Sequence, residues 1–281
     1  MDEDFISSAN RLIYHVFLPV LVFEKIALSN FTELFNPAPV GVLLGTILIM
    51  SVLGFLYARM LKISTASVAT FANNVFRANY AYIGLPICFY ALGEEGLALA
   101  SILLAFVAPL VNVLSIVTMN LGRLSEIKVK TLVIEVMVNP IVLAALAGIA
   151  FALSGWQMHA ILGNTLSTLS SITLPLALLA MGATININGL RGNIFTTGSA
   201  VVMKLILFPL ISFILLNLVN GSSALWDKVV ILMSASPSAM VNYVLAAEMD
   251  GDFELANSII VGTTIVSIIT FAVWMHLLGV D

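Results

Sequence analysis

The hydrophobic positions of the chain form nine long apolar segments, separated by short connections that contain most of the charged residues. A membrane-spanning helix needs about 20 predominantly apolar residues, and each segment is close to that length. The pattern therefore predicts an all-α polytopic membrane protein. The nine predicted spans cover residues 10–28, 39–60, 66–92, 97–121, 131–153, 164–185, 196–219, 228–248 and 254–278.

The composition agrees with a chain that lies almost wholly within a membrane. Of its 281 residues, 60% are hydrophobic and 9% are charged, whereas about a quarter are charged in a soluble domain. The single Cys88 excludes an internal disulfide and a cysteine metal cluster. The sequence shows no basic patch for nucleic acid and no nucleophile paired with a base. Its three histidines are scattered along the chain, so they indicate no metal site. We expect no metal, no cofactor and no enzyme activity.

The basic residues predict the orientation, because positively charged loops remain in the cytoplasm. With a cytoplasmic N-terminus, only Lys25 and Lys228 lie near the outer face, while Arg77 and Lys204 lie within spans. We expect a multi-pass protein of a bacterial inner (plasma) membrane, with its N-terminus inside and its C-terminus outside. The basic residues on the inner side are Arg11, Arg59, Lys62, Arg123, Lys128, Lys130 and Arg191.

Two polar stretches interrupt predicted spans. The third span contains Asn79-Tyr80-Ala81-Tyr82-Ile83-Gly84-Leu85-Pro86, and the eighth contains Ser234-Ala235-Ser236-Pro237-Ser238. Proline removes one backbone donor and clashes with the preceding turn, so nearby carbonyls lose their helical partners. In a membrane such groups must be satisfied by protein, water or a solute. We expect a broken helix at each stretch, and a binding site where they meet.

The order of these features predicts an inverted repeat. Pro19 and Pro175 lie 156 residues apart, and Pro86 and Pro237 lie 151 apart, so spans one to four match spans six to nine in opposite directions. This is the plan of many secondary transporters. The predicted parts are a first repeat at 1–121 with four of five spans, a cytoplasmic linker at 122–130 and a second repeat at 131–281 with five. The first half is expected to lack its first helix.

The candidate binding residues lie at or near the two breaks. Half-helix N-termini suit an anion, and half-helix carboxyl ends suit a cation. Several candidates also have a purely structural alternative. The prolines could simply kink their helices, and the asparagine amides could simply link neighbouring helices. The Arg77 side chain could extend to the cytoplasmic lipid headgroups. Lys204 fits an anchor beside Pro209, an ion-pair partner or an anion contact. The candidates are Arg77, Asn79, Gly84, Pro86, Asn112, Ser236, Pro237 and Asn242.

The most specific motif is Arg77-Ala78-Asn79-Tyr80-Ala81-Tyr82-Ile83-Gly84-Leu85-Pro86, followed by Gly93-Glu94-Glu95-Gly96. With residues 5–19, 174–182, 204–209 and 236–239, it resembles the auxin efflux carrier family, which includes plant auxin exporters and bacterial malonate or malate permeases. The resemblance implies a fold shared with bile-acid symporters and sodium/proton antiporters, in which two broken helices cross. It also implies carriage of small organic anions by alternating access, often by a dimer.

The predicted function is that of a secondary transporter for a small organic anion, a carboxylate, that works by an elevator-type movement. Spans two to four with seven to nine would move as a unit. Spans one, five and six would form a scaffold and the contact of a homodimer. Two alternatives stay open: a sodium-coupled symporter of the bile-acid type, which sodium dependence would reveal, and a membrane protein that senses a solute without transporting it, which would bind without counterflow.

Overall fold

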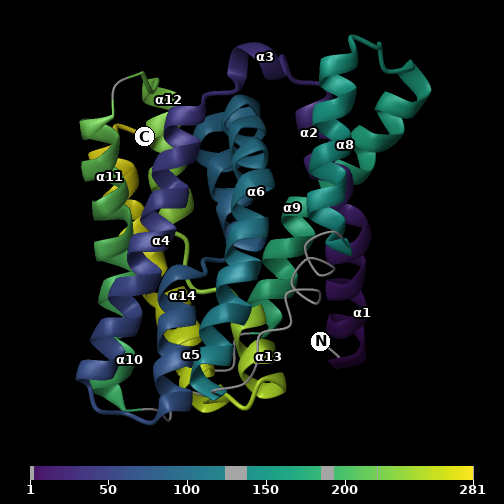
Figure 1. The fold of residues 1–281 in the computed structure, drawn as a ribbon. Helices are drawn as coiled ribbons and strands as arrows, with labels where there is room; N and C mark the ends of the chain where they lie inside the picture. Colours follow the sequence, from purple (N-terminus) through teal and green to yellow (C-terminus); the bar gives the residue numbers. More distant parts are fainter. Residues whose placement is uncertain (1–2, 124–137, 185–192, 220, 281) are drawn as a thin grey trace.

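The computed structural model describes residues 3–123, 138–184, 193–219 and 221–280. The regular secondary structure of this part of the chain is helical apart from one isolated β-bridge, with short loops between the helices (Figure 1). Most of the predicted linker at 122–130 and the start of the predicted fifth span lie outside the described residues. The α-helices are α1 Glu3–Leu12, α2 Leu18–Ala27, α3 Phe31–Leu34, α4 Pro37–Met60, α5 Thr65–Phe76, α6 Leu85–Arg123, α8 Pro140–Ser154, α9 Ala160–Thr184, α10 Ile194–Val202, α11 Phe208–Leu218, α12 Ala224–Ser234, α13 Val241–Glu248 and α14 Phe253–Leu277.

Three π-helical turns each lie directly before a proline at the second position of the next helix. These turns are η1 Ile13–Phe17, η2 Tyr80–Gly84 and η4 Met203–Leu207, and the prolines are Pro19, Pro86 and Pro209. A proline ring clashes with the carbonyl one turn earlier and donates no hydrogen bond to it. A widened turn makes room for the ring while the helix continues. Through η1 and η4, α1 continues into α2 and α10 into α11.

In the part of the chain that the structure describes, five helical segments are long and apolar enough to cross a membrane: Pro37–Met60, Tyr80–Leu121, Ala160–Ala183, Ile194–Leu218 and Phe253–Leu277. The second of these contains two helices that meet at Gly93, whose φ of 71° favours glycine. The count of nine spans stays a prediction, because the remaining predicted spans are divided among shorter helices or lie partly outside the described residues.

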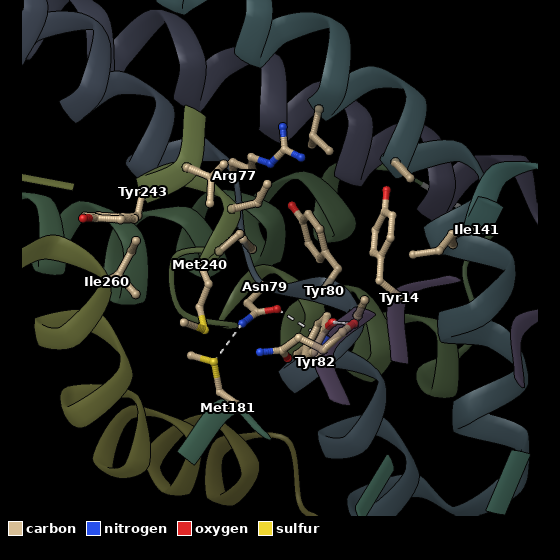
Figure 2. A pocket seen from close by; sticks show the side chains of 18 of the residues that line it. Tyr14, Arg77, Asn79, Tyr80, Tyr82, Ile141, Met181, Met240, Tyr243 and Ile260 are labelled. Carbon is tan, nitrogen blue, oxygen red and sulfur yellow. Dashed lines mark hydrogen bonds between the residues drawn. The ribbon is translucent and has the colours of Figure 1, made fainter. Parts of the chain in front are cut away.

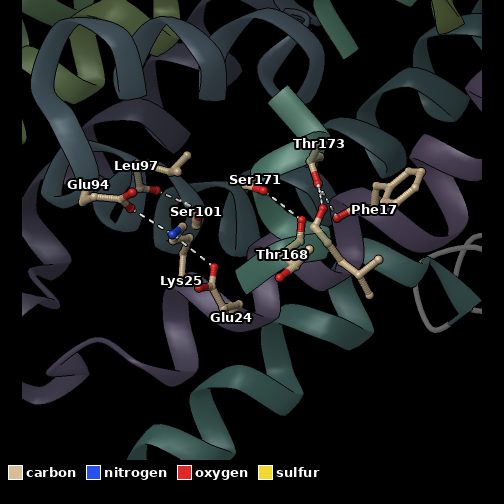
Figure 3. Close-up of polar contacts among 10 residues, drawn as sticks. Phe17, Glu24, Lys25, Glu94, Leu97, Ser101, Thr168, Ser171 and Thr173 are labelled. Carbon is tan, nitrogen blue, oxygen red and sulfur yellow. Dashed lines mark hydrogen bonds and ion pairs between the residues drawn. The ribbon is translucent and has the colours of Figure 1, made fainter. Parts of the chain in front are cut away.

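The helices form two groups on either side of α6 (Figure 1). In one group, α2 packs against α8 and α9, and the Thr173 hydroxyl of α9 donates to the Phe17 carbonyl at 3.2 Å (Figure 3). In the other group, α4 packs against α5 and α11, and α10 packs against α14. Helix α6 contacts α5 and α12 of the second group and α2 and α8 of the first. The interface between the groups therefore runs beside α6.

Candidate functional site

Two interruptions of the helical conformation pair with each other. The first lies between Phe76 and Tyr80, and the second between Ser234 and Val241. Ala78 and Ser238 form an antiparallel β-bridge. The Asn79 N–H donates to the Pro237 carbonyl at 2.7 Å, and the Ala239 N–H donates to the Arg77 carbonyl at 3.1 Å. Each interruption thus satisfies backbone groups of the other, as a buried backbone requires.

The first interruption lies earlier than the sequence predicts. Gly84 and Pro86 were expected to break the helix, but Gly84 ends the π turn and Pro86 lies in the first turn of α6. The π turn η2 widens the helix ahead of Pro86, so the proline ring is accommodated while the segment Tyr80–Leu121 continues as a helix. Asn79 begins the new helical segment: its side-chain oxygen accepts from the Tyr82 N–H at 3.3 Å, which is the usual role of an N-cap asparagine.

The two broken segments also lie close together at Gly84 and Ser236. A methyl group added to Gly84 would lie 2.8 Å from the Met233 sulfur and 3.2 Å from the Ser236 hydroxyl oxygen. Ser236 is fully buried, and its hydroxyl donates to the Leu232 carbonyl at 3.2 Å. Gly84, Ser236 and Pro237 therefore bring the two backbones together. None of them lines the cavity described below.

Asn242 belongs to a buried amide cluster rather than to the cavity. Its side chain accepts from the Asn73 amide at 3.2 Å, and donates to the Asn74 side-chain oxygen at 3.2 Å and to the Arg77 carbonyl at 3.3 Å. The Ser238 hydroxyl donates to the Asn74 carbonyl at 2.7 Å. These bonds connect α13 and the second interruption to α5. Asn242 thus fits the alternative of a link between helices.

Arg77 lies at the first interruption and is held by α6. Its guanidinium donates to the Asn112 side-chain oxygen at 2.7 Å and to the Ser115 hydroxyl at 2.8 Å. The side chain is partly buried and lines the cavity instead of extending along an exposed helix face. Asn112 therefore orients the cation, and it also lines the cavity itself.

A cavity of about 920 Å³ lies beside the two paired interruptions, which are called the crossing from here on (Figure 2). It is lined from α1 and η1, both interruptions, η2, α6, α8, α9, α13 and α14. Of the predicted site residues, Arg77, Asn79 and Asn112 line it. The Asn79 amide also donates to the Met181 sulfur at 3.5 Å. The predicted residues outside its lining are Gly84, Pro86, Ser236, Pro237 and Asn242.

The sequence prediction missed several residues of the cavity wall. Tyr80 and Tyr82 lie inside the predicted first break, and Met181 lies in a matched motif, so signals for these three were present. Tyr14 also lies in a matched motif, at residues 5–19, whereas Met240 carries no comparable signal. Tyr14 reaches the cavity from η1, where its hydroxyl accepts from the Asn139 amide at 3.3 Å.

Lys204 lies behind the crossing and is fully buried. Its ammonium donates to the Ser234 carbonyl at 3.1 Å and lies 4.0 Å from the centroid of the Phe208 ring. Ser234 is the last residue of α12, where helix carbonyls have no partners within the helix. The lysine therefore caps the carboxyl end of α12. This contact agrees with the structural anchor, one of the three roles considered for Lys204.

The family model described as "Membrane transport protein" matches residues 1–275. The chain belongs to this family. The resemblance to auxin efflux carriers is thereby confirmed, and membership assigns the chain to a family of transporters rather than of enzymes.

Relatives of this family align along nearly the whole chain. An uncharacterized transporter of Methanothermobacter thermautotrophicus is 25% identical over 281 residues, covering 98% of this chain and 89% of the relative. A protein of Rhizobium meliloti named "Putative malonate transporter" is 24% identical over 287 residues, covering 96% and 86%. An uncharacterized transporter of Methanocaldococcus jannaschii is 25% identical over 287 residues, covering 98% and 90%. With the apolar helices, these matches make the chain an integral multi-pass membrane transporter.

Proposed function

We propose that the chain is a secondary carrier that moves a small organic anion, a carboxylate, by elevator-type alternating access. One observation carries the proposal: the first residues of two helical segments and the Arg77 guanidinium line a single cavity. Tyr80 to Tyr82 open η2, and Val241 opens α13. Helix N-termini carry partial positive charge, so they and the guanidinium both favour an anion.

The opposite ends of the broken helices lie away from the cavity. Phe76 ends α5 and Ser234 ends α12, and both are fully buried and absent from its lining. The carbonyls at these ends are the groups that would attract a cation. One of them already receives the Lys204 ammonium. This arrangement supports an anion as the solute in the cavity.

The inverted repeat and the moving unit are parts of the same proposal. Matched segments of the two halves pair in an antiparallel direction at Ala78 and Ser238, which an inverted repeat requires at its centre. In the proposed movement, α4–α6 with α10–α14 shift past α1, α2, α8 and α9. The cavity lies between these groups, because both contribute to its wall. The homodimer stays a prediction.

The cavity extends toward one end of the helical bundle. Its lining includes Asn10 near the start of the chain, Tyr243 of α13 and Asn257 near the start of α14. Helices α1 and α13 lie in the lower half of Figure 1, whereas the C-terminus lies near the top. With the charge-based orientation, this is the cytoplasmic end. We therefore propose nine crossings, a C-terminus outside and a cavity that faces the cytoplasm in this structure.

Uptake into proteoliposomes tests the proposal. Full-length protein would be reconstituted and given labelled malonate, malate or indole acetate, each with and without a sodium gradient. We expect uptake of at least one carboxylate without a need for sodium. Uptake only with sodium would favour the bile-acid-type alternative. No transport of any of these acids, together with intact binding of another class of solute, would refute the carboxylate carrier.

A further inference from the structure

The charges that line the cavity are few and of one sign. Among the described residues, its lining contains Arg77 and Arg11 and no aspartate or glutamate. Arg11 is exposed, whereas Arg77 is partly buried at the crossing. An exposed charge is screened by water and salt, so it contributes little to binding. Among the described residues of the lining, Arg77 is therefore the cation that is at least partly buried.

Most of the remaining wall is apolar or aromatic. Figure 2 shows Met181 and Met240 on one side of Asn79, and Tyr80 and Tyr14 on the other. Methionine side chains adapt to ligands of irregular shape. A cavity of about 920 Å³ is also far larger than a compact dicarboxylate requires, and it lies in the size range of sites for drug-sized ligands. The aliphatic part of the wall comprises Leu104, Ala108, Val111, Ile141, Val241, Val244, Ile260 and Val261.

Tyr80 is the one cavity tyrosine whose hydroxyl is recorded as buried without a hydrogen-bond partner among the described residues. The residue is only 3% exposed. Tyr14, in contrast, has the Asn139 amide as a partner. Figure 2 shows the Tyr80 hydroxyl pointing toward the side of the cavity on which Arg77 lies. A buried hydroxyl without a partner is costly, and such groups in native proteins usually find one in water or a ligand.

We propose that the cavity binds a monocarboxylate with an apolar body, and that Tyr80 is a specificity-determining residue of this site. The carboxylate lies at Arg77 and accepts a hydrogen bond from the Tyr80 hydroxyl, while the body lies along the methionine and aliphatic wall. A second carboxylate would lose its water without gaining a cation, which is strongly unfavourable. The inference rests on the proposed function, and it distinguishes this chain from the relative named for malonate.

The test compares matched ligands on the purified full-length protein by isothermal titration calorimetry. Hexanoate and adipate have the same number of carbon atoms and differ by one carboxylate, hexanamide lacks the charge, and malonate is the compact dicarboxylate. We expect hexanoate to bind at least about tenfold more tightly than each of the other three, because an unpaired buried charge and a lost ion pair each cost more than this factor.

The Tyr80→Phe variant tests the hydroxyl separately. Hexanoate affinity should fall about tenfold, the usual value of one hydrogen bond to a charged group, while hexanamide affinity changes less. Tyr90→Phe is the matched control, because Tyr90 is 62% exposed and lies outside the cavity lining. It should leave both affinities unchanged. Melting temperatures of the two variants show whether each is folded.

The outcomes separate the two proposals. Malonate or adipate binding as tightly as hexanoate would overturn this inference and leave a carboxylate carrier in place. Equal binding of hexanoate and hexanamide would overturn the role of the charge at Arg77. Absence of binding by every carboxylate would contradict the proposed function as well. Since the ligand comparison uses the unaltered protein, it decides the question even where Tyr80→Phe does not fold.

Discussion

The Asn79 N–H donates to the Pro237 carbonyl across 2.7 Å, and this bond joins the two interruptions of the helices. The two residues come from opposite halves of the chain. Because the bond satisfies backbone groups that a helix would otherwise pair internally, each interruption depends on the other. Asn79 also faces the cavity, so the same residue connects the stability of the crossing with the proposed binding of solute.

Asn79→Ala should mainly weaken carboxylate binding, whereas Asn242→Ala should mainly lower the stability of the fold. The first removes an N-cap worth about 1 kcal/mol together with an amide of the cavity wall, so carboxylate binding should weaken with a small loss of stability. The second removes the acceptor of the buried Asn73 amide and the donor to the buried Asn74 side-chain oxygen, at a cost of about 2 kcal/mol. The Arg77 carbonyl keeps its bond from the Ala239 N–H. Melting temperatures and calorimetric affinities measure both. A larger loss of stability in Asn79→Ala would contradict the assignment of roles.

Gly84→Ala should destabilise the protein by about 1–3 kcal/mol, the usual cost of overpacking. The added methyl group would lie 2.8 Å from the sulfur of the fully buried Met233 and 3.2 Å from the Ser236 hydroxyl oxygen, so these packed side chains must shift. Gly45→Ala is a matched control, because it lies in α4 with no heavy atom within 4 Å of the added methyl group. Thermal unfolding of the two variants in detergent compares them. Equal melting temperatures would show that the segments do not pack at Gly84 as described.

Lys25→Met should destabilise the protein more than Glu94→Gln. Lys25 contacts Glu24 at 3.1 Å and Glu94 at 2.9 Å (Figure 3). Glu94 is 69% exposed at its side chain, so its loss should cost less than about 1 kcal/mol. Glu24 is buried, and removal of Lys25 leaves its charge uncompensated at a cost of about 3 kcal/mol. Chemical or thermal unfolding ranks the two variants. A more harmful Glu94→Gln would contradict this assignment of the ion pairs.

Asn112→Ala should weaken carboxylate binding although the proposed contact is made by Arg77. Asn112 accepts a hydrogen bond from the guanidinium at 2.7 Å, and its loss leaves the Ser115 hydroxyl at 2.8 Å as the other acceptor on α6. Without Asn112 the Arg77 guanidinium is less ordered in the unliganded protein, so part of the binding free energy is spent on ordering it. We expect about a fivefold loss of affinity, the scale of one modest hydrogen bond. Unchanged affinity would show that Asn112 does not position the cation.

The sequence predicts the helical membrane class, and it predicts breaks within residues 79–86 and 234–238. Three of the residues that it singles out for binding, Arg77, Asn79 and Asn112, line the cavity, and their binding role stays a prediction. Apolar length and the Gly and Pro positions carry this information locally. The sequence places the first interruption too late, because sequence alone does not show that a π turn can accommodate Pro86 inside a continuing helix. The widened turns before Pro19, Pro86 and Pro209 show how the chain accommodates such rings without ending the helix.

Asn242 shows a second limit of sequence reasoning. The repeat places it correctly beside the second interruption, but its neighbours Val241, Tyr243 and Val244 line the cavity while Asn242 turns toward α5. Successive residues of a helix point about 100° apart, so spacing alone does not tell which one faces a solute. Tyr14 shows the converse, because the packing of η1 against α8 and α9 brings it to the cavity.

Counterflow in proteoliposomes tests the central claim most directly. Vesicles that contain the full-length protein would be loaded with unlabelled hexanoate and diluted into labelled hexanoate, with Asn79→Ala vesicles as the comparison. A carrier with one alternating site should show a transient accumulation of label above equilibrium, reduced in the variant. Binding of hexanoate without such accumulation would contradict a carrier and would favour a membrane protein that senses a carboxylate without transporting it.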